Sequence, residues 1–207
     1  MASRINRGFF FEHVRQHLFA GRVKQPQVDG LSFILDSWEN ANARKDDRWL
    51  AYALATTHHE TDTKMKPIHE YGGNKYFFDK YDMAGKRPDV ARSLGNTQPG
   101  DGVLFHGRGY VQLTGRTNYK KMEDRFGIDL TSGAVAADFA LDGALAAKIM
   151  FYGMEKGVFT GKKLADYFNR TTEDWVNARR IINGVDKANV IAGYDRAYYA
   201  AISYTVA

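Results

Sequence analysis

The chain has 207 residues and no cysteine, which excludes disulfide bonds, thiolate metal sites and a cysteine nucleophile. Hydrophobic residues make up 44% and charged residues 26%, the balance of an ordinary globular protein, and we predict a single domain spanning residues 1–207. The net charge of +5 favours polyanionic partners. The basic residues are scattered, however, and their densest clusters are short pairs that we interpret as solvated surface, namely Lys120–Lys121, Lys162–Lys163 and Arg179–Arg180. Without a basic helix or an aromatic-basic stripe, we expect no nucleic-acid binding.

The beginning of the sequence shows no secretion signal. Its apolar run extends only from Phe9 to Phe11, and no stretch approaches the roughly 20 apolar residues of a membrane span. We therefore expect synthesis in the cytoplasm without a signal peptide and no stable membrane anchor. A target outside the membrane would be reached only after another system permeabilises the membrane.

Apolar residues at helical spacing predict a mostly helical chain. The segment 47–60 has the clearest start, with Asp46 or Asp47 as its N-cap. The full set of predicted helices covers residues 7–20, 27–43, 47–60, 117–126, 135–156, 162–169, 172–183 and 187–203.

Residues 61–116 differ, because they contain many glycines and few periodic apolar positions. Short strands are predicted near Tyr76–Phe78 and Tyr110–Leu113, and tight turns at Gly100–Gly102 and Gly107–Gly109. Long ordered loops in a compact domain are usually functional. We therefore predict a mainly α fold whose long irregular insert, with room for a short β-hairpin, forms the wall of a cleft.

Two carboxylates are candidates for acid–base chemistry. Glu60 ends the predicted helix 47–60 at the edge of its apolar face, and Glu70 follows ten residues later in the insert. A loop that leaves a helix can fold back across a cleft, and two opposed carboxylates suit glycoside hydrolysis. By position alone, a solvated surface role is the alternative for each.

A metal site is also conceivable, because three histidines lie near Glu60 in the sequence. They are His58, His59 and His69. A metalloprotease helix needs a second histidine four residues after the first, but Thr63 stands there. We therefore expect no metal and interpret these histidines as hydrogen-bonding groups that line the cleft or orient Glu60.

A glycine-rich run from Phe105 to Arg116 is neither a dinucleotide loop nor a phosphate loop. A dinucleotide loop would need a third glycine where Gln112 stands, and the Gly-Lys-Ser/Thr of a phosphate loop is missing. The run reads as a turn leading into a strand on which Gln112 and Thr114 face one way. Such side chains can hold a water molecule or a sugar hydroxyl.

Three blocks together resemble glycoside hydrolase family 19, the chitinase-like family, and especially its phage endolysin branch. They are Thr57–Thr61 (THHET), Phe105–Tyr119 (FHGRGYVQLTGRTNY) and Arg180–Gly184 (RIING), in the order that the family has them. The second block is long and specific, and the resemblance extends over nearly the whole chain. It implies a lysozyme-like, two-lobed helical fold with a cleft between the lobes.

The resemblance also implies cleavage with inversion at the anomeric carbon and roles for individual residues. Glu60 would be the general acid, Glu70 the general base, and Thr114 would help to hold the attacking water. The positions that would line the sugar subsites are His59, Gln112, Asn118 and Asn183. No metal or organic cofactor is implied, and the two carboxyl groups of an inverting enzyme stand roughly 6.5–9.5 Å apart.

Chitin and bacterial peptidoglycan share a β-1,4-linked amino-sugar backbone, so one cleft can serve either polymer. The lack of a signal peptide and of cysteines, the compact size and the basic charge favour a monomeric endolysin that cleaves peptidoglycan. A chitinase, a non-catalytic glycan-binding module on the same fold and a metallopeptidase that cuts wall cross-links are the alternatives.

Overall fold

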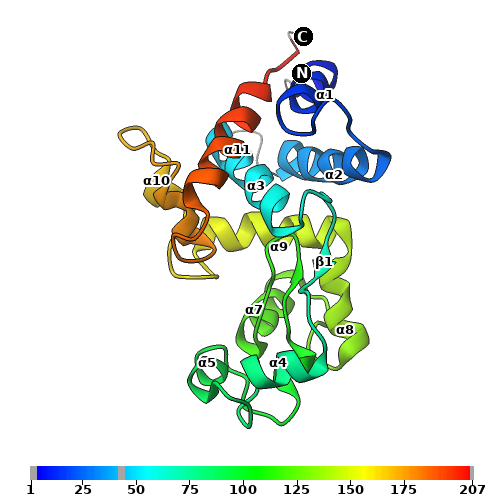
Figure 1. Cartoon of the computed structure of the whole chain (residues 1–207), viewed down its shortest axis with the longest axis vertical. Helices are drawn as coiled ribbons and strands as arrows, with labels where there is room; N and C mark the ends of the chain where they lie inside the picture. Colours follow the sequence, from blue (N-terminus) through cyan, green and yellow to red (C-terminus); the bar gives the residue numbers. More distant parts are fainter. Residues whose placement is uncertain (1–3, 42–44, 206–207) are drawn as a thin grey trace. The chain divides into compact units, whose positions relative to one another are not determined.

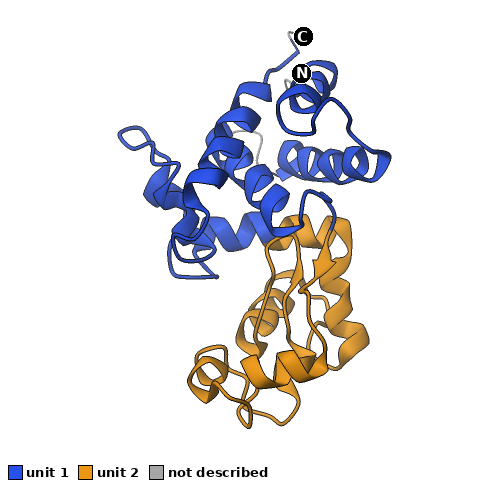
Figure 2. Ribbon diagram, viewed as in Figure 1, with its two compact units in different colours: residues 1–66, 150–207 blue, residues 67–149 orange. Residues whose placement is uncertain are grey.

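The computed structural model describes residues 4–41 and 45–205 and is mainly helical, as the apolar spacing predicts. The last two residues of the predicted helix 27–43 lie outside the described residues. The chain divides into two compact units, unit 1 with residues 1–66 and 150–207 and unit 2 with residues 67–149 (Figure 2). Unit 1 is thus assembled from two distant segments, whereas unit 2 is continuous. The single domain over residues 1–207 stays a prediction.

Unit 1 is built from helices. Its central element is α3, which is buried at every residue from Leu50 to His58 and packs along α11 (Figure 1). The helix begins where the Asp46 side chain accepts a hydrogen bond from the Arg48 backbone N–H at 3.0 Å. The helices of this unit are α1 (Arg7–His17), α2 (Gln25–Ala41), α3 (Asp47–Glu60), the C-terminal part of α9 (Gly143–Lys156), α10 (Leu164–Tyr167), the 3₁₀ helix η2 (Asn177–Ile181) and α11 (Ala188–Ala201).

His58 belongs to this core and does not line a cleft, contrary to our expectation. Its ring is 2% exposed, packs between Phe19 and Tyr194, and shares a hydrogen bond of 2.9 Å between Nδ1 and the Tyr198 hydroxyl. Burial, with a smaller contribution from the neighbouring His59, lowers the pKa of His58 to about 4. The folded protein therefore keeps this imidazole neutral under conditions in which an unfolded chain would protonate it.

We predict that the stability of unit 1 falls as the pH is lowered from about 6.5 to about 4. In that window the unfolded state binds a proton at His58 that the folded state excludes, which removes up to about 3 kcal/mol of unfolding free energy. Urea unfolding at several pH values measures the effect, and His58→Gln should flatten the profile over this window. Tyr198→Phe keeps the buried imidazole, so it should retain the slope; a flat profile in Tyr198→Phe would contradict the assignment to His58.

Unit 2 consists of short helices around a two-stranded sheet. The strands β1 (Ile68–His69) and β2 (Arg108–Gly109) are antiparallel, with Ile68 opposite Gly109 and His69 opposite Arg108. The helices are α4 (Asn74–Tyr81), α5 (Pro88–Ser93), α6 (Asp101–Leu104), α7 (Arg116–Phe126), α8 (Ala134–Asp138), the 3₁₀ helix η1 (Phe139–Leu141) and the N-terminal part of α9. The tight turns predicted at the glycines are present, because Gly100 and Gly109 have φ values of 87° and 94°.

Several predicted elements differ from the structure. Residues Tyr76–Phe78 lie in helix α4, not in a strand. The predicted helix 135–156 is divided into α8, η1 and α9. The break before α9 occurs at Asp142, whose backbone is extended and whose side chain caps α9 by accepting from the Leu145 N–H at 2.9 Å. Of the predicted helix 172–183, only the 3₁₀ turn η2 forms. Around Tyr110–Leu113 there is no continuous strand but a tight turn closed by paired hydrogen bonds between Arg108 and Leu113.

A close backbone contact joins α2 to the segment that follows α3. A Cβ atom at Gly30 would lie 1.6 Å from the carbonyl oxygen of Met65, so only glycine allows this approach. Met65 is itself buried and has a φ of 54°. The contact holds residues 62–66 against the first half of α2.

We predict that Gly30→Ala destabilises the protein by about 2 kcal/mol or more, since the clash is with backbone and cannot be relieved by a rotamer change. Gly193→Ala in α11 is the matched control, because a Cβ there meets nothing within 4 Å. It should stabilise by about 0.5–1 kcal/mol through helix propensity. Thermal unfolding of both variants measures the difference, and similar melting temperatures would show that α2 and residues 62–66 do not pack as described.

Candidate functional site

Glu60, the expected general acid, lies at the C-terminal end of α3 in unit 1 and forms an ion pair. Its Oε1 accepts a hydrogen bond of 2.6 Å from Nη1 of Arg179, whose side chain is 3% exposed against 18% for Glu60. Arg179 is anchored in turn by a hydrogen bond from its Nε to the Asp186 carbonyl at 3.2 Å. The carboxylate is therefore held in place from the protein interior, while part of it reaches solvent.

The arginine pair was expected to be solvated surface, and this is wrong for Arg179. Arg180 is exposed, as expected, whereas Arg179 turns inward from η2 to meet a carboxylate 119 residues away. No local pattern distinguishes the two arginines. The one available signal was that Arg179 directly precedes the Arg180–Gly184 block of the family resemblance.

A second carboxyl group lies buried in unit 1. Asp195 of α11 is fully buried, and neither of its carboxyl oxygens has a hydrogen-bond partner among the described residues. Burial raises the pKa of Asp195 well above its usual range, because the charged form of the carboxyl group is poorly solvated there. Burial likewise raises the pKa of Tyr52, which lies within electrostatic reach of Asp195, Arg179 and Glu60. Glu60 and Arg179 thus lie within reach of polar groups whose charged forms burial disfavours.

The remaining expected residues of unit 1 are more exposed. His59 is half-buried beside Glu60 on α3. Asn183 is exposed just after η2, and its backbone N–H donates to the Arg179 carbonyl at 3.0 Å. Asn183 therefore follows the segment that carries the partner of Glu60.

Glu70, the expected general base, lies in unit 2 directly after β1. Its Oε1 accepts hydrogen bonds from Nζ of Lys80 at 2.9 Å and from the Tyr81 hydroxyl at 3.0 Å. Among the described residues, its Oε2 accepts only a long hydrogen bond, 3.3 Å, from the Gly107 N–H. One oxygen is thus fully engaged, and the other keeps lone pairs for a further ligand.

The donors on Glu70 keep their protons at neutral pH. Burial by itself would lower the pKa of Lys80, but hydrogen bonds to Tyr76, Tyr81 and Glu70 outweigh it and hold that pKa above its ordinary value. Burial raises the pKa of Tyr81 to about 12. Neither Lys80 nor Tyr81 was identified from the sequence. They follow Glu70 by 10 and 11 residues, and no sequence motif links a carboxylate to a lysine and a tyrosine at that spacing.

Gln112 lies beside Glu70 and has an unusual backbone. Its φ of 54° is in the left-handed region, which a non-glycine residue adopts at some energetic cost. A Cβ built on Gly107 would lie 2.7 Å from Oε1 of Gln112 and 3.1 Å from Oε2 of Glu70, so both oxygens flank this glycine. Oε1 of Gln112 is buried and has no hydrogen-bond partner among the residues described. It is an acceptor without a partner next to Oε2 of Glu70, which has the long hydrogen bond from Gly107.

Thr114 and Asn118 continue the same cluster. The Thr114 hydroxyl donates to the Gln112 carbonyl at 2.8 Å, and the Asn118 amide donates to the Thr114 carbonyl at 2.9 Å. Unit 2 therefore brings together Glu70, Gln112, Thr114 and Asn118. Glu60, His59 and Asn183 belong to unit 1, so a meeting of acid and base across a cleft stays a prediction.

Two histidines stand next to Glu70. His106 donates through Nδ1 to the Val103 carbonyl at 2.7 Å, so its Nε2 is the acceptor of the 3.0 Å hydrogen bond with Nδ1 of His69. Its ring stacks on Phe77 at 4.2 Å, and burial lowers the pKa of His106. His69 was one of the three histidines noted near Glu60, but its partner is this neutral imidazole.

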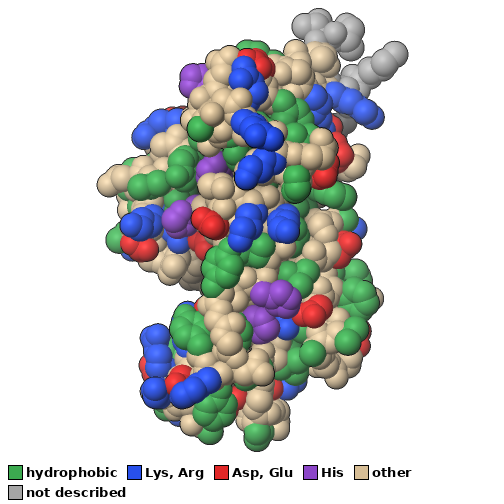
Figure 3. Space-filling view, turned by 45° about the vertical axis from the view of Figure 1, so that its right-hand side comes forward, with side chains coloured by type: hydrophobic (Ala, Val, Ile, Leu, Met, Phe, Trp, Pro, Cys, Tyr) green, Lys and Arg blue, Asp and Glu red, His purple; other side chains and the backbone are tan. Residues whose placement is uncertain are grey.

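Within residues 4–41 and 45–205, no group of three or more His, Asp or Glu side chains is arranged to hold a metal ion. No helix in the same ranges combines the length and apolar character of a membrane span. Lys and Arg side chains occur in separate groups on the face drawn in Figure 3, with apolar and acidic side chains between them. On this face the positive charge is spread, as it is in the sequence.

Compared with protein-family models the chain matches none, and no curated protein matches it significantly. The resemblance to glycoside hydrolase family 19 therefore rests on the three sequence blocks.

We predict that Arg179→Met destabilises the protein by about 2–3 kcal/mol, because it leaves the Glu60 carboxylate without its buried cation. Arg180→Met removes the same charge from an exposed neighbour and should change stability by less than about 0.5 kcal/mol. Chemical unfolding measures both. In the double variant with Glu60→Gln, part of the loss should be recovered, and strictly additive effects would contradict a direct interaction.

Proposed function

We propose that the protein is an endolysin-type peptidoglycan hydrolase of glycoside hydrolase family 19 with a lysozyme-like fold. It would cleave β-1,4 glycosidic bonds of the cell-wall glycan with inversion. The observation that supports this best is the cluster in unit 2 beside Gly107. There Oε2 of Glu70 accepts one long hydrogen bond from the Gly107 N–H, and Oε1 of Gln112 has no partner among the described residues. These residues come from the insert and from the long Phe105–Tyr119 block, in which the resemblance assigns them to the base and to the substrate.

The two oxygens suit the activation of a water molecule. A water has two hydrogens, and here Oε2 of Glu70 would accept one and Oε1 of Gln112 the other. Oε1 of Glu70 remains bound to Lys80 and Tyr81, which keep the carboxylate oriented while Oε2 takes the proton. The Thr114 hydroxyl donates to the Gln112 carbonyl, so it would support the turn that carries Gln112 and would hold the water only indirectly.

Glu60 would act as the general acid of the reaction. Since its Oε1 accepts from Arg179, the transferable proton would reside on Oε2 and pass to the leaving glycosidic oxygen. The Arg179 guanidinium then stabilises the carboxylate that forms. The enzyme would be made in the cytoplasm, act as a monomer and reach the wall after membrane permeabilisation.

Hydrolysis of purified peptidoglycan by the wild type, Glu60→Gln and Glu70→Gln tests the proposal. Each variant should lose about 10²- to 10⁴-fold in rate, because each removes one proton-transfer group. Glu12→Gln removes an exposed carboxylate of α1 and should keep full activity. New reducing ends and free amines are assayed together, and the anomeric configuration of the first product is read by NMR.

The outcomes separate the candidate functions. Reducing ends with inverted configuration that vanish in both variants would support the proposal. Faster cleavage of chitin oligomers than of peptidoglycan would favour a chitinase, and binding of either polymer without turnover would favour a glycan-binding module. Free amines without reducing ends, abolished by a chelator, would identify a metallopeptidase.

A further inference from the structure

A pocket of about 360 Å³ lies in unit 1, between the start of α2 and the segment that follows α3. This volume is at the lower end of the range for small-molecule sites, about 300–1,000 Å³. A side chain or a short peptide fits it better than a polymer. Its lining consists of Lys24, Pro26, Gln27, Asp62, Thr63, Lys64 and Lys66.

One wall of the pocket has an unusual backbone. Asp62 and Thr63 have φ values of 50° and 61°, and buried Met65 after them is also left-handed. None is a glycine, so this geometry costs conformational energy that surrounding contacts must offset. The Thr63 N–H donates to the His58 carbonyl at 2.8 Å, and the Met65 N–H donates to the Thr61 hydroxyl at 3.0 Å.

Gln27 ties this wall to α2. Its side-chain Nε2 donates to the Thr63 carbonyl at 2.9 Å, while its Oε1 accepts from the Lys24 N–H at 2.8 Å. The contact between Gly30 and the Met65 carbonyl reinforces the same junction. The pocket is therefore formed by a fixed backbone, not by mobile side chains alone.

The charge around the pocket is positive. Three lysines and one aspartate line it, and α2, which has no acidic residue in its first turn, adds the positive end of its dipole. Within the described part of the chain, neither Lys24 nor Lys66 forms an ion pair with a carboxylate. Two ammonium groups are thus available to an anionic ligand.

The position of the pocket indicates which anion it serves. Its left-handed wall begins two residues after Glu60, so the expected acid and the pocket share the end of one helix. A ligand there would belong to the same polymer chain as the bond being cut. Chitin is uncharged, whereas peptidoglycan carries short peptides with free carboxylates on alternate sugars.

We infer that this pocket binds the carboxylates of the peptide that branches from the peptidoglycan strand, and so selects the peptide-bearing glycan over chitin. The inference rests on the proposed function and names its substrate class. Lys24 and Lys66 supply the charge, and the rigid 62–66 segment holds the peptide close to Glu60.

The test compares binding of two defined probes to the wild-type protein by calorimetry and by amide chemical shifts. One is a disaccharide–tetrapeptide from peptidoglycan with free carboxylates, and the other is the same compound with its carboxylates converted to amides. The free acid should bind about tenfold more tightly and shift the amides of residues 62–66. Combined Lys24→Gln and Lys66→Gln should lower that affinity about fivefold to tenfold, since each exposed ion pair contributes up to about fivefold.

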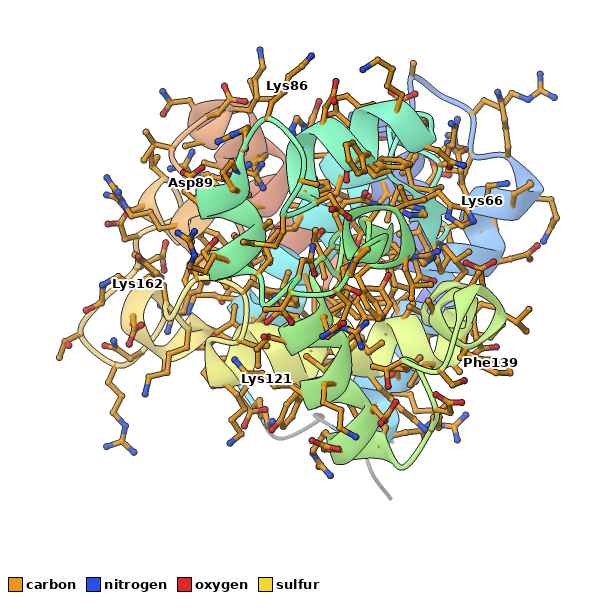
Figure 4. All side chains as sticks on the ribbon, turned by 90° about the horizontal axis from the view of Figure 1, so that it is seen from below. Lys66, Lys86, Asp89, Lys121, Phe139 and Lys162 are labelled. Carbon is orange, nitrogen blue, oxygen red and sulfur yellow. The ribbon has the colours of Figure 1, made fainter. Side chains whose placement is uncertain are left out.

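The matched control combines Lys162→Gln and Lys163→Gln. Both are exposed lysines of unit 1, and Lys162 lies on the opposite side of the view from Lys66 (Figure 4). This variant has the same net charge as the pocket variant and should retain wild-type binding. An equal loss of affinity for the free-acid probe in both variants would show that net charge alone causes the effect, and it would overturn the inference.

Other results also decide the matter. Equal affinity for the acid and amide probes, or binding of anionic lipid vesicles but not of the free-acid probe, would overturn the pocket assignment. Hydrolysis of peptidoglycan and chitin oligomers is measured on the same variants. If the pocket variant cuts both polymers at wild-type rates, the inference fails while the proposed hydrolase stands. If the wild type binds the acid probe at residues 62–66 but cuts neither polymer, the hydrolase fails while the pocket stands.

Discussion

Helix α3 is buried along most of its length, and its packing against α11 fixes the direction in which its C-terminal end points. The candidate acid, its ion-pair partner and the pocket wall all lie at or next to this C-terminal end of α3. Glu60 is its last residue, Arg179 meets Glu60 from the protein interior, and the strained 62–66 segment continues from it. A loss of packing between α3 and α11 would therefore displace the Glu60 carboxylate more directly than it would displace the surface elements.

Unit 2 positions its carboxylate, Glu70, by a short β ladder and not by the end of a buried helix. Two residues of β1 pair with two residues of β2, and this short ladder places Glu70 against Gly107 through backbone and side-chain hydrogen bonds. The tight turn that follows forces Gln112 into a left-handed conformation and turns its amide toward the same point. Both units thus hold a carboxylate by a nearby cation, and both place it where regular structure ends.

The sequence predicts α3 residue by residue, because an aspartate cap and a clear apolar period agree there. It fails at Tyr76–Phe78, where aromatic residues favour strand by propensity but Phe77 is buried by stacking on His106 in a helix. The expected base and its neighbours Gln112, Thr114 and Asn118 are found together, whereas Arg179, Lys80 and Tyr81 were missed. Such partners are determined by tertiary contacts across up to 119 residues, and no local spacing encodes them.

The discontinuity of unit 1 has a consequence for synthesis on the ribosome. Residues 67–149 are contiguous and emerge as a complete unit, whereas α3 must wait for α11, which is translated more than 120 residues later. Until then α3 can pack on α2 but lacks its main partner α11, and for most of that interval Glu60 lacks Arg179. The nascent chain therefore carries its expected acid in an unassembled state for most of its translation, and chaperone binding to exposed α3 would be strongest in that interval.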